Sequence, residues 1–146
     1  MKIIKKSNLI HNISIKHKDI GFVPTMGALH EGHISLIKKS KEKSKKTIVS
    51  IFVNPKQFNK KKDFATYPNN LRNDLSICKK LKVDYVFIPN AQEIYRWNDI
   101  KNLKPKIDNI MEGKFRKGHL NGVLAVMSKF LSIVKCSKIY MGKKDY

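Results

Sequence analysis

The sequence predicts an α/β fold in which helices flank a parallel β-sheet. Short β-branched, apolar runs alternate along the chain with segments whose apolar residues recur at helical spacing. Such alternation is typical of βαβ units, which build parallel sheets with right-handed crossovers. The most unusual segments, residues 24–33, 54–58 and 142–146, each follow an expected strand. Because ligands bind beyond the carboxyl ends of parallel strands, this placement indicates a ligand site at one edge of the sheet.

The expected elements follow in order from the apolar pattern. A buried strand at 20–24 is expected to stop at its proline, and a helix to begin at His33 and run, rich in lysine, through Lys46. β-branched residues predict a strand at 47–53, closed by the Asn-Pro pair that follows. The remaining expectations are a polar loop at 56–68, a helix at 71–81, a strand at 84–88, an irregular segment at 91–106, an amphipathic helix at 123–134 and a strand at 138–141.

The charge of the chain is extreme. Its 146 residues fit one domain and carry a formal net charge of +20, which suggests nucleic acid or an anionic membrane as a partner. However, only three of the 31 basic residues are arginines, Arg72, Arg96 and Arg116. Phosphate and base recognition favours the planar guanidinium group of arginine. The favoured interpretation is therefore a solvated lysine surface with no specific nucleic-acid partner.

Targeting signals and cysteine motifs are missing from the sequence. No stretch of about 18 apolar residues occurs, and no signal-peptide pattern follows the basic N-terminus. Cys78 and Cys136 lie far apart and form neither a disulfide framework nor a metal-binding motif. These features predict a cytoplasmic protein with no membrane partner.

The most chemical information lies in the segment Pro24-Thr25-Met26-Gly27-Ala28-Leu29-His30-Glu31-Gly32-His33. Gly27 and Gly32 allow close backbone approach or positive φ. A helix that begins at His33 would offer free N–H groups and the positive end of its dipole to a phosphate. His30 and His33 could donate hydrogen bonds to phosphate oxygens as charge builds during nucleotidyl transfer. A zinc pair is disfavoured because no third ligand lies nearby, whereas an ordinary surface loop stays open on this segment alone.

This segment resembles the pantothenate synthetase family of the HxGH nucleotidylyltransferase-like superfamily, whose pattern Pro-Thr-Met-Gly-x-Leu-His-x-Gly-His it matches throughout. Residues 50–58, Ser-Ile-Phe-Val-Asn-Pro-Lys-Gln-Phe, resemble the second hallmark of the family. Further matches follow in the family's order: Tyr67-Pro68, Asp74, Val83-Asp84, Glu112-Gly113, Arg116, Gly118-His119, Gly122-Val123 and Gly142-x-Lys144-Asp145-Tyr146. The resemblance covers essentially the whole chain and implies a Rossmann-like sheet of the HxGH nucleotidyltransferase type.

The resemblance implies an ATP-dependent ligase that joins pantoate to β-alanine through a pantoyl adenylate, with Mg²⁺ and as a homodimer. The implied ATP-binding residues are Met26, Gly27, Ala28, Leu29, His30, Glu31, Gly32, His33, Gly142, Lys143, Lys144 and Asp145. The implied catalytic residues are His30, His33 and Lys144, with His33 as the best candidate for proton donor. The implied pantoate and β-alanine residues are Asn54, Gln57, Tyr67, Arg116 and His119, and Asp74 would assist magnesium directly or through water.

Other interpretations of single residues stay open. The Gln57 amide can donate to a carboxylate and accept from a hydroxyl or amine, yet it can equally be a polar loop residue. Tyr67 can be a packing residue, and a helical aspartate such as Asp74 more often faces solvent. The family has arginine where this chain has Asn121 and glutamate where it has Lys143.

The end of the sequence also departs from the family. Family members continue with two glutamines, a phosphate-binding loop and a small C-terminal lid domain. Residues 1–146 are therefore expected to be a nucleotide-binding domain without the lid, from a partial sequence or a shortened gene, and to have little activity alone. Two alternatives remain, namely a related adenylyltransferase that uses another acid and a basic nucleic-acid-binding module on a decayed enzyme fold.

Overall fold

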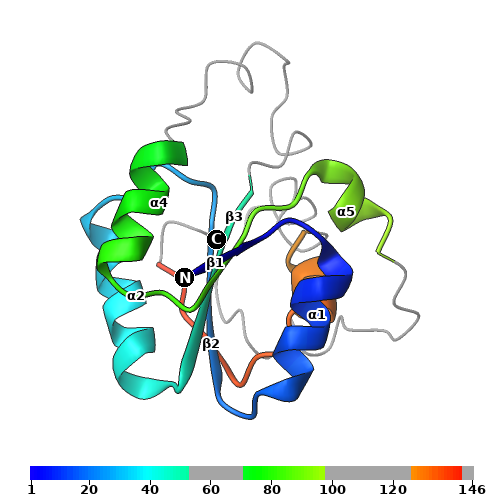
Figure 1. Cartoon of the computed structure of the whole chain (residues 1–146), viewed down its shortest axis with the longest axis horizontal. Coiled ribbons are helices and arrows are strands. Elements are labelled where there is room, and N and C mark those ends of the chain that lie inside the picture. Colours follow the sequence, from blue (N-terminus) through cyan, green and yellow to red (C-terminus); the bar gives the residue numbers. More distant parts are fainter. Residues whose placement is uncertain (53–70, 98–125, 143–146) are drawn as a thin grey trace, which may run out of the picture.

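The computed structural model describes residues 1–52, 71–97 and 126–142. In these ranges a parallel sheet lies between two layers of helices (Figure 1). The expected fold class, a parallel sheet flanked by helices, is confirmed. The expected loop at 56–68 and most of the expected irregular segment at 91–106 lie outside the described residues.

The described part of the sheet has the strand order β1-β4-β3-β2-β5, and every neighbouring pair is parallel. The strands are β1 (Lys2–Ile4), β2 (Ile20–Thr25), β3 (Lys46–Ile51), β4 (Tyr85–Phe87) and β5 (Lys138–Ile139). The last four confirm the predicted strands, whereas β1 was not predicted. β2 and β3 pair over their whole length, from Ile20 opposite Lys46 to Thr25 opposite Ile51. This central pair is the longest pairing in the described sheet.

Helices connect the strands and cover both faces. They are α1 (Ser7–Lys16), α2 (Glu31–Lys43), α4 (Leu71–Lys80), α5 (Ala91–Tyr95) and a further helical stretch at 126–133. The sequence predicted that α2 begins at His33. This is wrong, because the first turn of α2 begins at Glu31 with His30 as the N-cap. The expected irregular character of residues 91–95 is also wrong, because the Asn90 side chain accepts a hydrogen bond from the Glu93 N–H group and caps a short helix.

Alternating side chains of the central strands supply both halves of the core. Ile20, Phe22 and Ile48 face α1, α5 and the stretch at 126–133, where Phe130 packs against Phe22 with ring centroids 6.0 Å apart. The core on the opposite face lies between the sheet and the helices α2 and α4, and its buried residues are Val23, Leu29, Ile37, Val49, Ile51, Cys78, Val83 and Val86. Because helices cover both faces of the sheet, side chains on either side of a strand are buried. The strands are therefore continuous apolar runs in the sequence.

The strand order places a topological switch point between β2 and β5. The chain passes from β2 through β3 to β4 in one direction, whereas β5 joins the other side of β2. The carboxyl ends of β2 and β5 therefore lie together at the point where the order reverses. Open α/β sheets bind ligands beyond the carboxyl ends of strands at such a point.

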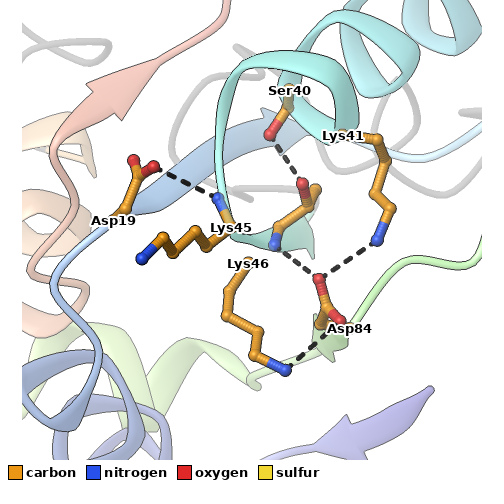
Figure 2. Close-up of polar contacts among 7 residues, drawn as sticks. Asp19, Ser40, Lys41, Lys45, Lys46 and Asp84 are labelled. Atoms are coloured by element: carbon orange, nitrogen blue, oxygen red, sulfur yellow. Dashed lines mark hydrogen bonds and ion pairs between the residues drawn. The ribbon is translucent and has the colours of Figure 1, made fainter.

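The opposite, amino-terminal edge of the sheet is held by an aspartate. The Asp84 carboxylate accepts a hydrogen bond from the Thr47 N–H group at 2.8 Å and pairs with Lys41 and Lys46 at 3.4 and 3.9 Å (Figure 2). The Thr47 hydroxyl in turn shares a buried hydrogen bond of 2.7 Å with Ser40. These contacts tie the start of β3 to the end of α2 and to the residue before β4. Within the described ranges, no helix is long and apolar enough to cross a membrane.

Candidate functional site

The site is built on the tight turn that follows β2. The Thr25 hydroxyl donates to the Ser50 carbonyl at 2.9 Å and accepts from the Gly27 N–H group at 3.2 Å. Gly27 and Ala28 have φ values of 83° and 53°, so two successive residues adopt the left-handed region. That conformation suits glycine but costs a residue with a side chain on the order of 1 kcal/mol. The turn at Ala28 therefore needs support from its surroundings.

Asp74 of α4 supplies this support from a distant part of the chain. Its Oδ2 atom accepts from the Ala28 N–H group at 3.0 Å, and its Oδ1 atom accepts from the Leu29 N–H group at 2.8 Å. Asp74 is 1% exposed. Both carboxylate oxygens are thus occupied by main-chain donors of the turn.

His30 and His33 cap the first turn of α2 reciprocally. The His30 ring accepts from the Gly32 N–H group at 3.0 Å and from the His33 N–H group, while the Nδ1 atom of His33 accepts from the His30 N–H group at 3.3 Å. This is a capping box in which two imidazoles replace the usual hydroxyl and carboxylate. The expectation of free N–H groups at this helix start is therefore wrong for most of the first turn.

The capping box fixes the tautomer of both rings. A ring nitrogen that accepts a hydrogen bond carries no proton, so each neutral imidazole holds its proton on Nε2. The two rings lie with their centroids 4.1 Å apart. His30 is exposed, whereas His33 is 8% exposed. The pair therefore carries two N–H donors of the kind that phosphate oxygens accept, held in place by the helix that it caps.

The other predicted residues of this segment have different surroundings. Met26 and Ala28 are half-buried, and Glu31 and Gly32 are exposed. Leu29 is 7% exposed and packs in the core on the α2 side, and its N–H group is bound by Asp74. The structure thus uses Leu29 to anchor the turn.

Two further segments reach the same edge of the sheet. The Phe52 N–H group donates to the Thr25 carbonyl at 3.0 Å, so the chain leaving β3 runs beside the turn. The Tyr140 N–H group donates to the Phe22 carbonyl at 2.9 Å, and this brings the half-buried Gly142 towards the end of β2. The remaining predicted site residues lie outside the described residues: Asn54, Gln57, Tyr67, Arg116, His119, Lys143, Lys144 and Asp145.

The described residues contain no preformed cluster of metal ligands. No group of three or more histidine, cysteine, aspartate or glutamate residues is placed to hold a metal in residues 1–52, 71–97 and 126–142. Asp74, the predicted magnesium residue, is buried with both oxygens bound to N–H groups. These two bonds use one acceptor position on each oxygen, and the magnesium role of Asp74 stays a prediction.

The thiols of the described residues are poor nucleophiles. Burial raises the pKa of Cys78 to about 12, with a smaller contribution from the negative charge of Asp74. Burial also raises the pKa of Cys136 to about 11. Since the thiolate is the reactive form, both side chains stay protonated and unreactive at neutral pH. We therefore do not count either thiol among the candidate catalytic groups.

Sequence reasoning found the histidine pair but missed the role of Thr25 and the contact between Asp74 and the turn. Thr25 lies inside the recognised segment, and a hydroxyl two residues before a left-handed turn is a usable signal of a side-chain-stabilised turn. The clamp by Asp74 has no local signal, because its partners lie 45 and 46 residues away.

Comparison with known proteins gives consistent matches over nearly the whole chain. The family model described as Pantoate-beta-alanine ligase matches residues 2–146. The pantothenate synthetases of Francisella tularensis subsp. novicida strain U112 and subsp. tularensis strain SCHU S4 are each 51% identical over 145 residues. Each alignment covers 98% of this chain and 56% of the relative. The chain thus spans about half the length of the curated relatives it matches.

Solved structures show the same likeness. A pantoate-beta-alanine ligase from Francisella tularensis, complexed with beta-gamma ATP and beta-alanine, superposes with a TM-score of 0.77 at 46% identity. That match covers 95% of this chain and 55% of the other. A pantothenate synthetase from Thermus thermophilus gives a TM-score of 0.80 at 31% identity, over 100% of this chain and 53% of the other. The fold is therefore the Rossmann-like nucleotidyltransferase fold of these structures.

Proposed function

This chain belongs to the pantoate-β-alanine ligase family, and from that premise we propose that residues 1–146 are the nucleotide-binding domain of an ATP-dependent ligase that condenses pantoate with β-alanine. The observation that carries the proposal is the histidine capping box beside the switch point of the sheet. It supplies paired N–H donors where an α/β sheet binds nucleotides. The related structure from Francisella tularensis is complexed with beta-gamma ATP and beta-alanine, which supports the proposal that this chain binds a nucleotide.

The proposed reaction has two steps. An oxygen of the pantoate carboxylate attacks the α-phosphorus of ATP, and the bond to the bridging oxygen breaks to release pyrophosphate. The amine of β-alanine then attacks the acyl carbon of pantoyl adenylate, loses a proton and expels AMP. Magnesium would enter with the nucleotide as its counter-ion, held largely by the phosphates.

The described residues would act by positioning and by charge stabilisation. Negative charge accumulates on the phosphate oxygens as the phosphorus–oxygen bond breaks, and preorganised donors stabilise it. The Nε2–H groups of His30 and His33 are such donors in this proposal. Their rings are already held by backbone hydrogen bonds, so they need little reorganisation during the reaction. Lys144, Gly142 and Asp145 would bind the nucleotide from the neighbouring strand end, and Gln57 and Asn54 the acid.

The proposal extends to the whole protein in three respects. Pantoate and β-alanine are its substrates, a homodimer is its assembly, and the cytoplasm is its location. The family membership supports the first, since the family is described by that reaction. The other two are tested by sedimentation and by localisation of the tagged protein.

A binding experiment tests the function without requiring turnover. The sulfamate analogue of pantoyl adenylate should bind the chain more tightly than sulfamoyl adenosines that carry other acyl groups, because intermediate analogues gain from both halves of the site. Affinities are measured by titration calorimetry, with ATP as reference. Equal affinity for unrelated acyl groups would indicate an adenylyltransferase for another acid, and absence of binding to ATP and to every analogue would refute the proposal.

A further inference from the structure

Asp74 is a buried carboxylate that has no charged partner among the residues that the structure describes. Asp74 is 1% exposed, and none of the ion pairs within the described residues includes it. Within the described part of the chain, it accepts hydrogen bonds from the N–H groups of Ala28 and Leu29, at 3.0 and 2.8 Å. An ionised group in such a position must be matched by well-placed donors, because burial otherwise penalises the charge.

The turn supplies those donors in an arrangement suited to an anion. Gly27 and Ala28 have positive φ values, and the successive N–H groups of Ala28 and Leu29 both donate to the Asp74 carboxylate. Successive backbone N–H groups in a turn form a small anion-binding concavity. The Asp74 carboxylate fills this concavity. A Cβ atom added at Gly27 would lie 3.2 Å from Asp74 Oδ2, which shows how closely the side chain approaches the backbone. The main-chain donors that could have received a phosphate are therefore already bound by the protein itself.

The geometry points to a positioning role for Asp74: we propose that its carboxylate locks the turn Gly27–Leu29, and so holds His30 and His33 in place for the nucleotide, rather than binding magnesium. This rests on the function proposed above. His30 directly follows Leu29 and is the N-cap of α2, so a shift of the turn moves the cap and the ring together. The Asp74 carboxylate thus links α4 to the site.

The test compares Asp74→Asn with a matched control. An asparagine keeps the shape of aspartate but presents an NH₂ group to one of the two N–H donors, so the lock is lost. Thr47→Val is the control, because it removes the buried hydrogen bond to Ser40 at the opposite edge of the sheet. ATP affinity is measured in EDTA and in excess Mg²⁺, and exchange of the Ala28 and Leu29 amide protons is followed by NMR in EDTA.

The unmodified chain and the two variants are expected to behave differently. In the unmodified chain without metal, the amides of Ala28 and Leu29 should be protected, and Asp74→Asn should speed their exchange by tenfold or more. Asp74→Asn should weaken ATP binding by a similar factor with and without Mg²⁺. Thr47→Val should lower the melting temperature but change ATP affinity less than twofold. Adding Ala28→Gly to Asp74→Asn should recover part of the lost affinity, since glycine tolerates the left-handed φ.

The opposite pattern would overturn the proposal. If the two amides exchange freely in the unmodified chain, or if Asp74→Asn weakens ATP binding in Mg²⁺ alone, Asp74 is a magnesium ligand and the turn is held otherwise. The exchange measurement needs no ligand. If the unmodified chain does not bind ATP but its two amides are protected, the proposed function fails while the lock stands.

Discussion

At the scale of single residues, the two histidines of the site have two tasks that can be separated. Each ring accepts a backbone hydrogen bond through Nδ1, which stabilises the start of α2, and each carries its proton at Nε2. The Nδ1 acceptor stabilises the helix, and the Nε2–H donor is proposed to bind the phosphate. Substitutions that keep one and remove the other distinguish them.

His33→Ala and His33→Gln form the first such pair. His33 is 8% exposed, so its side chain has buried contacts to lose. Alanine should cost about 1–2 kcal/mol of stability, since the cap and the buried contacts are both lost. Glutamine is a common partner at this position of a capping box and should recover most of that stability. Neither variant should recover ATP affinity, because both lack imidazole. Urea denaturation and calorimetry measure the two effects, and full affinity in His33→Gln would contradict the role of the ring.

Gly32→Ala tests the His30 ring without altering it. A Cβ atom at this position would lie 2.8 Å from Cε1 of His30, so the ring has to move away from its cap. Alanine favours the helix by up to ~1 kcal/mol over glycine, which offsets part of the lost hydrogen bond. We therefore expect near-normal stability with ATP affinity reduced about tenfold, the cost of a hydrogen bond to a charged group. Unchanged affinity would show that the position of His30 is unimportant.

The sequence allowed the histidine pair to be predicted because both residues lie in one short segment after a strand. It did not allow the role of Asp74 to be predicted, since a single aspartate on an amphipathic helix gives no sign of a partner 45 residues away. The start of α2 was placed at His33 because the apolar pattern begins there. The helix begins earlier because the His30 side chain can serve as a cap, a role usually taken by serine, threonine, aspartate or asparagine.

At the scale of elements, the site depends on the close packing of α2 against β2. Gly21 of β2 lies under Ser40 of α2, and a Cβ atom there would collide with the Ser40 hydroxyl and lie 2.9 Å from that of Ser44. Gly21→Ala should push the helix off the strand and break the Ser40–Thr47 hydrogen bond. We expect a loss of about 2–3 kcal/mol, typical of overpacking with a lost buried bond, measured by urea denaturation. The double variant Gly21→Ala/Ser40→Ala should be less destabilised than the sum of its parts, and simple additivity would argue against the contact.

The elements that sequence analysis missed are short or weakly patterned. β1 has three residues and pairs only with β4 within the described sheet, so it carries almost no periodic signal. α1 buries Ser7, Ile10 and Ser14, and two serines on the buried face hide its amphipathic pattern. Tertiary contacts stabilise it instead, for example the Ser7 hydroxyl that donates to the Glu93 carbonyl at 2.9 Å. By contrast, the long apolar runs of β2 and β3 were predictable because both of their faces are buried.

At the scale of the whole molecule, the two edges of the sheet have different electrostatic character. At the amino-terminal edge, Asp19 and Asp84 each pair with lysines, at 3.6 Å to Lys138 and at 3.4 Å to Lys41. Such half-exposed pairs contribute little stability individually, about 0–1 kcal/mol. At the carboxyl-terminal edge, the buried Asp74 binds main-chain groups. Anionic substrates are therefore expected to meet hydrogen-bond donors at one edge, while the large positive charge of the surface stays mainly solvated.

The last prediction concerns these 146 residues tested by themselves, which we expect to bind ATP but to form almost no pantothenate. The chain spans 56% of the length of its pantothenate synthetase relatives, so much of their length has no counterpart in it. Adenylate formation requires donors around the phosphates in a site that excludes water. Here His30 is exposed, and the histidine donors come from one side of the turn after β2. An open site also lets water hydrolyse the acyl adenylate before β-alanine attacks it.

The measurement supplies Mg-ATP, pantoate and β-alanine to the purified chain and follows AMP and pantothenate by mass spectrometry. The pantothenate synthetase of Francisella tularensis, assayed in parallel, shows that the conditions support turnover. AMP without pantothenate would indicate that the adenylate forms and is lost to water, which agrees with the prediction. Pantothenate formation on the order of 1 s⁻¹, an ordinary rate for an enzyme, would show that these residues suffice to enclose the transition state. In that case the hydrogen-bond donors that complete the site must come from within residues 1–146. Lys144 and Arg116 would then be the first residues to test by substitution.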